Sequence, residues 1–280
     1  MIDISKYGDR LVVGVSGGKD STATCLHLLE QGHTKDGFDR VFIDTGWEHP
    51  KTYKYIDELQ STVGEIVTIS ADIEVKNEHK EFCLEIEDNL GFVSPFVRQV
   101  LNYAMFPTNR HQWCTKRIKI DPLSKYLKEM EFEPINVTGI RRAESRRRAD
   151  MKGMEYSGLF DCWQYRPIID WSESDVIAIH HRFGLSPNPL YLSGSVRVGC
   201  WPCVQSNKKE MSFFNSQGRI DIIRSLEKYL SDYRKKSVTY YKYRDIDTVL
   251  EWSKTSYGGK QYFLFDLDEP ACARWGMCGV

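Results

Sequence analysis

One short stretch of the sequence has the residue types and spacing that phosphate binding requires. An apolar run at residues 11–15 leads directly into Ser16, Gly17, Gly18, Lys19, Asp20 and Ser21, and an apolar helical pattern follows. A glycine turn that opens a helix presents backbone N–H groups and the positive end of the helix dipole to an anion. Lys19 adds a mobile positive charge. We therefore expect a strand, a phosphate-binding loop and a helix in this order.

Two widespread phosphate motifs do not describe this stretch. A Walker A loop requires Gly six residues before the Lys and Ser or Thr directly after it. Val13 and Asp20 occupy those two positions here, and the dinucleotide pattern G-x-G-x-x-G is absent. The loop therefore belongs to another class of phosphate site.

Cysteines form a second set of residues that could carry chemistry. Cys200 and Cys203 make a Cys-x-x-Cys pair, and Cys114 lies in a basic segment at residues 113–123. Such a pair is typical of metal and redox sites. Three thiolates need one further ligand to close a tetrahedral zinc site or to ligate an iron–sulfur cluster fully.

The C-terminal tail offers two candidates for that fourth ligand, Cys278 and Cys272. Cys162 is a weaker candidate. Cys25 and Cys83 fall within helical patterns, which favours an interpretation as buried core thiols.

Arginines follow another expected strand. Residues 134–139 have a strand pattern that ends in Gly139, and Arg141 and Arg142 begin a run of five arginines that ends at residue 148. A guanidinium group can bind a phosphate or a sulfate through two hydrogen bonds. The alternative is a solvated basic loop. We expect anion binding, because the run begins at the carboxyl end of a strand.

The elements that must position these residues alternate along the first half of the chain. This alternation predicts an α/β fold, with a Rossmann-like, doubly wound and mainly parallel sheet. Ligands of such sheets bind at the carboxyl ends of the strands, so Asp44 and Thr45 should converge with the phosphate loop. We expect strands at residues 11–15, 40–44, 65–69, 134–139 and 166–170, helices at 21–31, 50–62, 77–105, 122–130, 172–183 and 220–229, and an ordered loop at 186–199.

Composition limits the function classes. The chain has 280 residues, 41% hydrophobic and 28% charged, and a formal net charge of −1, which excludes a uniformly basic nucleic-acid coat. No apolar run approaches the roughly 20 residues that span a bilayer, and the polar first ten residues lack a signal-peptide core. We expect a cytoplasmic protein without membrane contact, whose eight cysteines are ligands, catalytic groups or buried thiols.

The chain changes character after residue 206. Basic residues outnumber acidic ones at residues 207–260 and alternate with tyrosines and other aromatic residues. This pattern suits a nucleic-acid surface, or equally a solvated helical face with buried aromatic side chains. We expect a nucleotide-binding domain at residues 1–206 and a helical extension with a cysteine-containing tail at residues 207–280.

These segments together resemble the phosphoadenosine-phosphosulfate reductase family of the adenine nucleotide alpha-hydrolase (ATP pyrophosphatase) superfamily. The resemblance covers about residues 8–206 and rests on residues 16–21, 44–46, 113–123, 139–147 and 171–203. It implies that residues 16–21 hold the phosphates of ATP or an adenylyl nucleotide. It also implies that Asp44 and Thr45 border the nucleotide, and that Gly139, Arg141 and Arg142 lie at its anionic groups.

Departures from the family indicate the subtype. Reductases without a cluster lack the Cys200–Cys203 pair, and cluster-bearing adenylyl-sulfate reductases have adjacent cysteines where this chain has Trp113-Cys114. Both end in Glu-Cys-Gly-(apolar)-His, whereas this chain ends in Met-Cys-Gly-Val. The pattern is more similar to the sulfur-transfer proteins of DNA phosphorothioation.

That resemblance implies an enzyme that uses ATP with Mg²⁺ to adenylate an acceptor, a nucleic acid. Lys19, Asp20 and Arg141 would be catalytic. A [4Fe–4S] cluster, or alternatively Zn²⁺, would sit on Cys114, Cys200, Cys203 and Cys278 or Cys272, with a cysteine-desulfurase-type sulfur donor. One alternative is a sulfonucleotide reductase in which Cys278 is the nucleophile and thioredoxin the partner. Another is a non-catalytic nucleotide-binding subunit.

Overall fold

A six-stranded sheet forms the centre of the protein in the computed structural model, which describes residues 4–108, 110–211, 218–241, 243–256 and 275. The strand order is β3-β2-β1-β4-β6-β5, and all neighbours are parallel except β5 and β6. The strands are β1 (Arg10–Val15), β2 (Phe38–Asp44), β3 (Val67–Ser70), β4 (Pro134–Val137), β5 (Met154–Ser157) and β6 (Cys162–Tyr165). The predicted doubly wound, mainly parallel sheet is confirmed.

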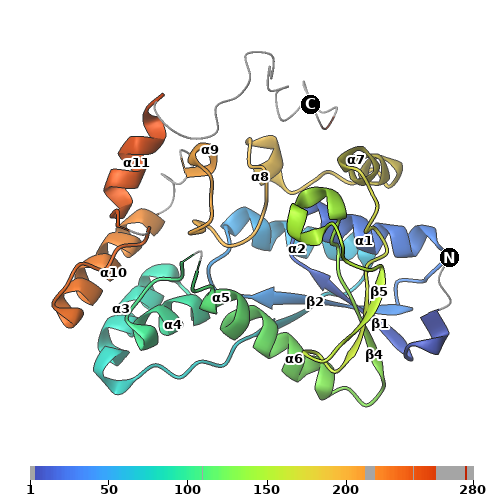
Figure 1. Cartoon of the computed structure of the whole chain (residues 1–280), viewed down its shortest axis with the longest axis horizontal. Helices are drawn as coiled ribbons and strands as arrows, with labels where there is room; N and C mark the ends of the chain where they lie inside the picture. Colours follow the sequence, from blue (N-terminus) through green and yellow to red (C-terminus); the bar gives the residue numbers. More distant parts are fainter. Residues whose placement is uncertain (1–3, 109, 212–217, 242, 257–274, 276–280) are drawn as a thin grey trace.

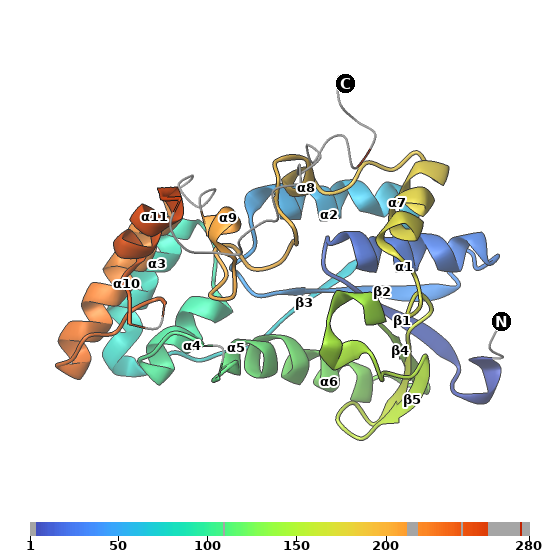
Figure 2. The same cartoon turned by 45° about the horizontal axis from the view of Figure 1, so that its top comes forward.

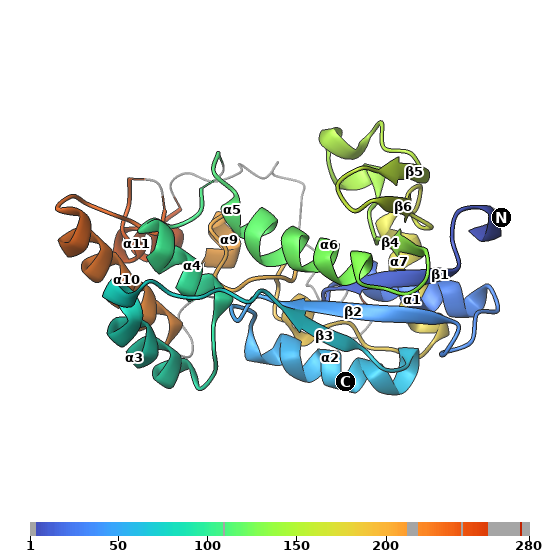
Figure 3. The ribbon, with the colours of Figure 1, turned by 90° about the horizontal axis from the view of Figure 1, so that it is seen from below.

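Helices cover both faces of this sheet (Figures 1 and 2). α1 (Lys19–Glu30), α2 (Pro50–Val63) and α7 (Glu173–Arg182) pack on one face, where they share an apolar cluster with β1. α6 (Asp121–Lys128) packs on the other face and runs beside β2 in Figure 3. Because β1 is covered on both faces, its sequence is a continuous apolar run rather than an alternating one.

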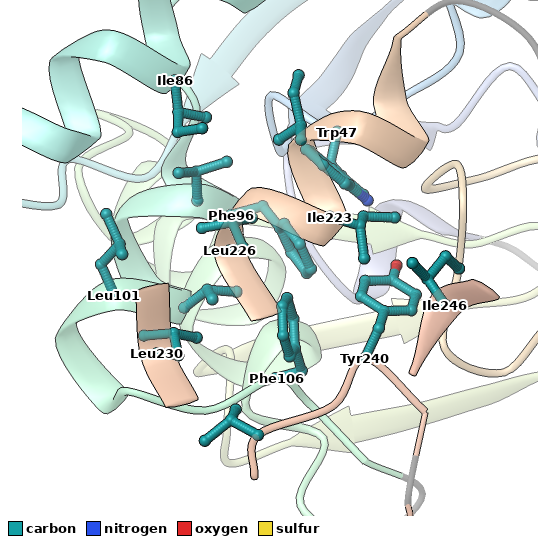
Figure 4. Close-up of a cluster of buried hydrophobic side chains, with 14 of the residues drawn as sticks. Trp47, Ile86, Phe96, Leu101, Phe106, Ile223, Leu226, Leu230, Tyr240 and Ile246 are labelled. Atoms are coloured by element: carbon teal, nitrogen blue, oxygen red, sulfur yellow. The ribbon is translucent and has the colours of Figure 1, made fainter. Parts of the chain in front are cut away.

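A group of helices lies beyond one end of the sheet. It consists of α3 (Lys80–Leu90), α4 (Pro95–Tyr103), α10 (Arg219–Arg234) and α11 (Ile246–Lys254). One apolar cluster joins these helices to Trp47, which follows β2 (Figure 4). The predicted helical extension is therefore present, and its core is shared with helices that precede residue 206. The boundary at residue 206 stays a prediction.

Short elements complete the described chain. The 3₁₀ turns are Ile4–Lys6, Asn77–His79, Arg142–Glu144 and Arg146–Arg148; the short helices are α5 (Trp113–Thr115), α8 (Pro189–Leu192) and α9 (Lys208–Met211). A π-helical turn, Lys116–Ile120, connects α5 to α6. No helix within the described ranges is long and apolar enough to cross a membrane.

One predicted strand is wrong, and the elements that were not expected include β5, β6 and α11. Residues 166–170 form turns, in which Ile169 N–H donates to the Arg166 carbonyl, because Pro167 has no N–H to give to a ladder. The strand lies earlier, as β6 in a hairpin with β5. The predicted helix at 77–105 is two helices, since Gly91 ends α3 in the left-handed region and Ser94 caps α4. The predicted helix at 172–183 is present as α7, where Ser172 and Asp175 form a capping box.

Candidate functional site

The phosphate loop connects β1 to α1 and is held by its own side chains. Gly17 has a φ of 69°, which glycine adopts without strain. The Ser16 and Ser21 hydroxyls lie 3.1 Å apart, and the Ser21 hydroxyl donates to the Gly18 carbonyl at 3.0 Å. Lys19 N–H donates to the Tyr191 hydroxyl at 3.1 Å. The loop is therefore fixed before any ligand binds, and its first helical turn opens into a cleft.

The end of β4 packs directly on the start of α1. A Cβ atom at Gly139 would lie 2.6 Å from the Asp20 carbonyl oxygen, so only glycine permits this approach. Arg141 then reaches across and donates from Nε to Asp20 Oδ1. Both side chains are largely buried. The ion pair fixes a guanidinium group at the mouth of the phosphate loop.

A cleft of about 700 Å³ contains most of the predicted nucleotide-binding residues. The predicted residues that line it are Ser16, Gly18, Lys19, Asp20, Ser21, Gly139 and Arg141. Two separate stretches of sequence, one between β1 and α1 and one after β4, thus meet where ligands of parallel sheets bind.

Four other predicted residues lie outside this lining, and one of them is Gly17, within the loop itself. Arg142 donates to the Met151 carbonyl at 2.8 and 3.0 Å and pairs with Asp170, so it fastens its own loop. Asp44 accepts hydrogen bonds from Tyr53 and from the Gly46 N–H. Thr45 interacts with Glu48, on the side of the cysteines. The expected convergence of Asp44 and Thr45 with the phosphate loop is not seen among the residues that line the cleft.

Residues far along the chain complete the cleft. Glu173, at the start of α7, lies 3.3 Å from Lys19 Nζ, and the Tyr191 ring lies 5.0 Å below that ammonium group. Arg148 and Arg197 add positive charge to the lining. Sequence reasoning did not assign Tyr191 or Glu173, because no local pattern connects residues more than 150 positions apart.

Three of the predicted ligand cysteines share a second cavity, of about 240 Å³. Cys114 comes from α5, and Cys200 and Cys203 come from the loop after α8. That loop is fixed to the loop after β2: Cys200 and Glu48 form an antiparallel bridge, and Trp201 N–H donates to the Trp47 carbonyl at 2.7 Å. The cavity is thus assembled by long-range contacts.

Charged groups surround the thiols. Cys200 Sγ lies 3.8 Å from Glu48 Oε1, and burial raises the pKa of the Cys200 thiol to about 11, although the nearby Lys119 opposes this. Interaction with Cys200 is the largest of the effects that raise the pKa of Lys119, so that ammonium group stays charged. Arg197 Nη2 donates to Cys203 Sγ at 3.3 Å. Two cations, Lys119 and Arg197, therefore lie where they would stabilise the thiolate forms of Cys200 and Cys203.

The donor chemistry suits a thiolate-bound cofactor. Soft sulfur ligands favour iron–sulfur clusters or zinc, and three of them line this one cavity. Glu210 lines it too; its side chain is 7% exposed and its Oε1 has no hydrogen-bond partner. In the described part of the chain, no three His, Cys, Asp or Glu side chains are grouped closely enough to hold a metal ion. Cys272 and Cys278 lie outside the described residues.

Two residues join the cavities. Arg197 and Val198 line both the phosphate cleft and the cysteine cavity. In the sequence, Arg197 stands three positions before Cys200, and nothing in that spacing assigns it a role. Only the folded chain shows that one side chain borders both compartments.

A Gly-rich phosphate loop, arginine cations and the carboxyl ends of a parallel sheet together define an α/β nucleotide-binding protein. The chain belongs to the phosphoadenosine phosphosulfate reductase domain family, which residues 10–206 match. The family resemblance predicted from the motifs is therefore confirmed. The phosphorothioation-type subgroup stays a prediction.

Individual relatives agree with this assignment. An uncharacterised 37.8 kDa protein of Escherichia phage 186 is 29% identical over 98% of each chain. The adenosine 5'-phosphosulfate reductase of Salinibacter ruber is 24% identical, over 71% of this chain and 69% of its own. Among solved structures, the phosphoadenylyl-sulfate reductase of Candida auris matches with a TM-score of 0.51 and 16% identity, over 72% of this chain and 85% of that one. This last likeness shows the shared fold.

Proposed function

We propose that this protein is an ATP-dependent enzyme that adenylates an acceptor, a nucleic acid, and supports sulfur transfer to it. The observation that carries the proposal is the wall that the phosphate cleft and the cysteine cavity share at Arg197 and Val198. An intermediate activated in the cleft would need only a short movement to meet a sulfur species held beside the thiols. Separate sites would require release and rebinding.

The cleft suits the first step. An acceptor oxygen would attack the α-phosphorus of ATP; a new P–O bond forms and the bond to pyrophosphate breaks. Lys19 and Arg141 would neutralise charge on the departing pyrophosphate, and Mg²⁺ bound with ATP would supply further positive charge there. Asp20 would position Arg141, because their ion pair holds the guanidinium group in place. The loop N–H groups add further stabilisation at the start of α1.

The cavity suits the second step. Sulfide, released from the persulfide of a cysteine-desulfurase-type donor by a thiol reductant, would attack the adenylated atom, and AMP would leave with the bonding electrons. Cys114, Cys200 and Cys203, with Cys278 or Cys272, would hold a [4Fe–4S] cluster or Zn²⁺. When bound, an iron–sulfur cluster would supply a place for sulfur to bind close to the cleft. Lys119 would oppose the burial that raises the pKa of the Cys200 thiol, and Arg197 would donate to Cys203 Sγ, so both cations would favour the thiolates that ligation requires.

A second candidate function is reduction of an adenylyl sulfate. Relatives named adenosine 5'-phosphosulfate reductase favour it, including the one from Salinibacter ruber. The same cleft would hold the nucleotide, Cys278 would attack the sulfur, and thioredoxin would resolve the product. A non-catalytic nucleotide-binding subunit is the remaining alternative, in which the cleft binds ATP without turnover.

One set of assays separates these candidates. Protein purified without oxygen is analysed for iron, sulfide and zinc, and is then given ATP, with and without nucleic acid, or adenylyl sulfate with thioredoxin. Our proposal expects iron and sulfide in the protein and pyrophosphate release that nucleic acid stimulates. Sulfite from adenylyl sulfate, lost on Cys278→Ser, would establish the reductase instead. ATP binding without either product would leave the non-catalytic subunit.

A further inference from the structure

A groove of about 840 Å³ lies beside the cysteine loop, and the chemistry proposed above does not use it. Its lining comes from the segment before α5, from residues 204 and 211, and from the chain around α11. Arg110, His111 and Arg244 line it, and no Asp or Glu does among the residues that the structure describes. The groove therefore suits an anionic ligand.

Aromatic side chains make up much of the remaining lining, which includes Tyr240, Tyr241, Tyr243 and Trp252. Tyr243 is 86% exposed, the largest value among the exposed large hydrophobic residues of the described chain. Lys208 Nζ lies 4.9 Å and Arg244 Cζ 5.9 Å from the Trp252 ring centre. Aromatic surfaces and the cations Arg110 and Arg244 thus line one groove, and Lys208 lies beside its Trp252. A ligand that matches both has flat rings and negative charge at short intervals.

The groove borders the cysteine cavity directly. Val204 lines both, so the loop that carries Cys203 forms a wall between them. Two tyrosines of the groove hold that wall: the Tyr241 hydroxyl donates to the Cys203 carbonyl at 2.9 Å, and the Tyr240 hydroxyl donates to the Pro202 carbonyl at 2.7 Å. Phosphate cleft, cysteine cavity and groove are therefore three neighbouring compartments, and each adjacent pair shares lining residues.

We propose that this groove binds an unpaired segment of nucleic acid, with bases stacked on Tyr243 and Trp252 and phosphates at Arg110 and Arg244. The inference rests on the proposed function, in which the acceptor is a nucleic acid. It adds where on the protein that nucleic acid binds and that the bound segment is single-stranded. An unpaired strand is required, because the bases of a duplex stack on each other and leave no face for a side chain. An acidic peptide would satisfy the cations but not the aromatic surfaces.

The test measures binding of the full chain to fluorescent single-stranded DNA and RNA of about 16 nucleotides, the upper length for one such site. A duplex of the same length and heparin, an anion without bases, serve as comparisons. We expect at least about tenfold tighter binding of one single strand than of duplex or heparin. Whether DNA or RNA binds more tightly identifies the source of the strand. Equal binding of heparin and single strands would overturn the proposal.

Variants assign the binding to this groove. Tyr243→Ala should weaken single-strand binding by about tenfold, whereas Tyr233→Ala, on α10, should change it less than about twofold. Arg244→Gln should reduce the slope of log K against log salt by about 0.7, and Lys228→Gln should not. Tyr233 and Lys228 are exposed side chains of α10. Unchanged affinity and salt slope in both groove variants would locate the strand elsewhere.

A fluorescence measurement on a conservative variant tests the site without relying on a loss of binding, which misfolding could also cause. Strand binding should quench tryptophan emission in the wild type, and Trp252→Phe should remove part of that quenching while retaining an aromatic surface and tight binding. The full quenching amplitude in Trp252→Phe would contradict the proposal. Pyrophosphate release without single-strand binding refutes only the groove, whereas single-strand binding without pyrophosphate release refutes only the proposed ATP chemistry.

Discussion

Hydrogen bonds among residues 16–21 help to hold the phosphate loop, whereas the cysteine cavity is assembled entirely from distant segments. Ser16 and Ser21 are five positions apart, but Cys200 and Glu48 are 152 positions apart. The first region owes its shape to a strand end, a glycine and a helix start. The second requires that α5, the loop after β2 and the loop after α8 all dock correctly. The phosphate loop should therefore respond to local changes, and the cavity to changes throughout the fold.

The largest expected effect is loss of turnover without loss of structure. Lys19→Ala removes the ammonium group at the phosphate loop, and we expect pyrophosphate release from ATP to fall by about 10²–10³-fold, which is typical for loss of one charge-stabilising group. The cysteine cavity should keep its thiol reactivity, since Lys19 is not part of its lining. Single-turnover pyrophosphate assays and thiol titration measure the two regions separately.

Lys54→Ala is the matched control. Lys54 is an exposed residue of α2 whose side chain pairs only with Glu58 in the described chain. Its loss should leave turnover within about twofold of the wild type, in line with the small energies of surface ion pairs. Comparable turnover in Lys19→Ala and Lys54→Ala would remove the phosphate loop from the chemistry.

The next effect concerns the helices that support the cysteine cavity. Glu227 of α10 is buried and accepts N–H groups of Tyr240 at 2.7 Å and Ile246 at 3.0 Å. Burial outweighs these hydrogen bonds and raises its pKa from the ordinary 4.5 to about 7. The folded state therefore holds the proton more tightly than the unfolded state does. This contribution to stability is complete below about pH 4.5 and is lost as the pH rises to about 7.

Glu227→Gln keeps an oxygen acceptor and has no charge to bury. The variant should match the wild type at pH 4 and exceed its unfolding free energy by on the order of 3 kcal/mol at pH 8. Urea unfolding at several pH values measures the difference in unfolding free energy between the variant and the wild type. Other titrating groups are common to both proteins, so their contributions cancel in this difference. Glu251→Gln, on exposed α11 surface, should show no such pH-dependent gain. A difference that does not vary with pH would show that Glu227 is ionised at no cost in the folded protein.

The two regions also differ in how far the sequence predicts them. The order Ser-Gly-Gly-Lys-Asp-Ser after an apolar run predicts a loop at a strand end, because strand, turn and helix start are local properties of the chain. The Cys-x-x-Cys pair suggested a site shared with Cys114, and one cavity brings them together. Lys119 and Glu210 were not foreseen, since a charged residue in a helical pattern is ordinarily solvated.

Topology sets the remaining limit on prediction. Asp44 and Thr45 follow β2, and the general rule for strand ends placed them with the nucleotide. Thr45 instead bonds to Glu48, whose bridge partner is Cys200, so the end of β2 supports the cysteine side. A sequence identifies a strand end, but its neighbours depend on which distant loop packs over it. Arg142, beside Arg141, shows the same limit, because Met151 and Asp170 bind it instead.

A third prediction concerns the close approach of β4 and α1. Gly139→Ala would place a methyl group 2.6 Å from the Asp20 carbonyl oxygen, which is backbone and cannot rotate away. We expect destabilisation by about 1–3 kcal/mol and weaker nucleotide binding, since the phosphate loop must shift. Denaturant unfolding and ATP titration measure both. Gly158→Ala is the control, because no atom lies within 4 Å of its added Cβ. Equal stability of the two variants would contradict this packing.

The smallest expected effect tests whether a nucleotide bound in the phosphate cleft changes the reactivity of the cysteine cavity. Arg197 is half-exposed, donates to Cys203 Sγ and also lines the phosphate cleft. A bound nucleotide should draw this guanidinium toward its phosphates and away from the thiol, because phosphate is the stronger acceptor. A non-hydrolysable ATP analogue should therefore change the alkylation rate of Cys203 by about two- to fivefold in the wild type, within the range for a partly exposed charged contact.

In Arg197→Gln the same analogue should leave the alkylation rate of Cys203 unchanged, while the basal rate differs from that of the wild type. Mass spectrometry of the labelled peptide gives both rates, at analogue concentrations that saturate each protein. Arg182→Gln, which breaks an exposed pair with Glu30, should retain the full response. A response that survives in Arg197→Gln would mean that nucleotide reaches the cysteines through the backbone of the shared wall. The local loop and the assembled cavity would then be coupled by residues 198–203 rather than by one side chain.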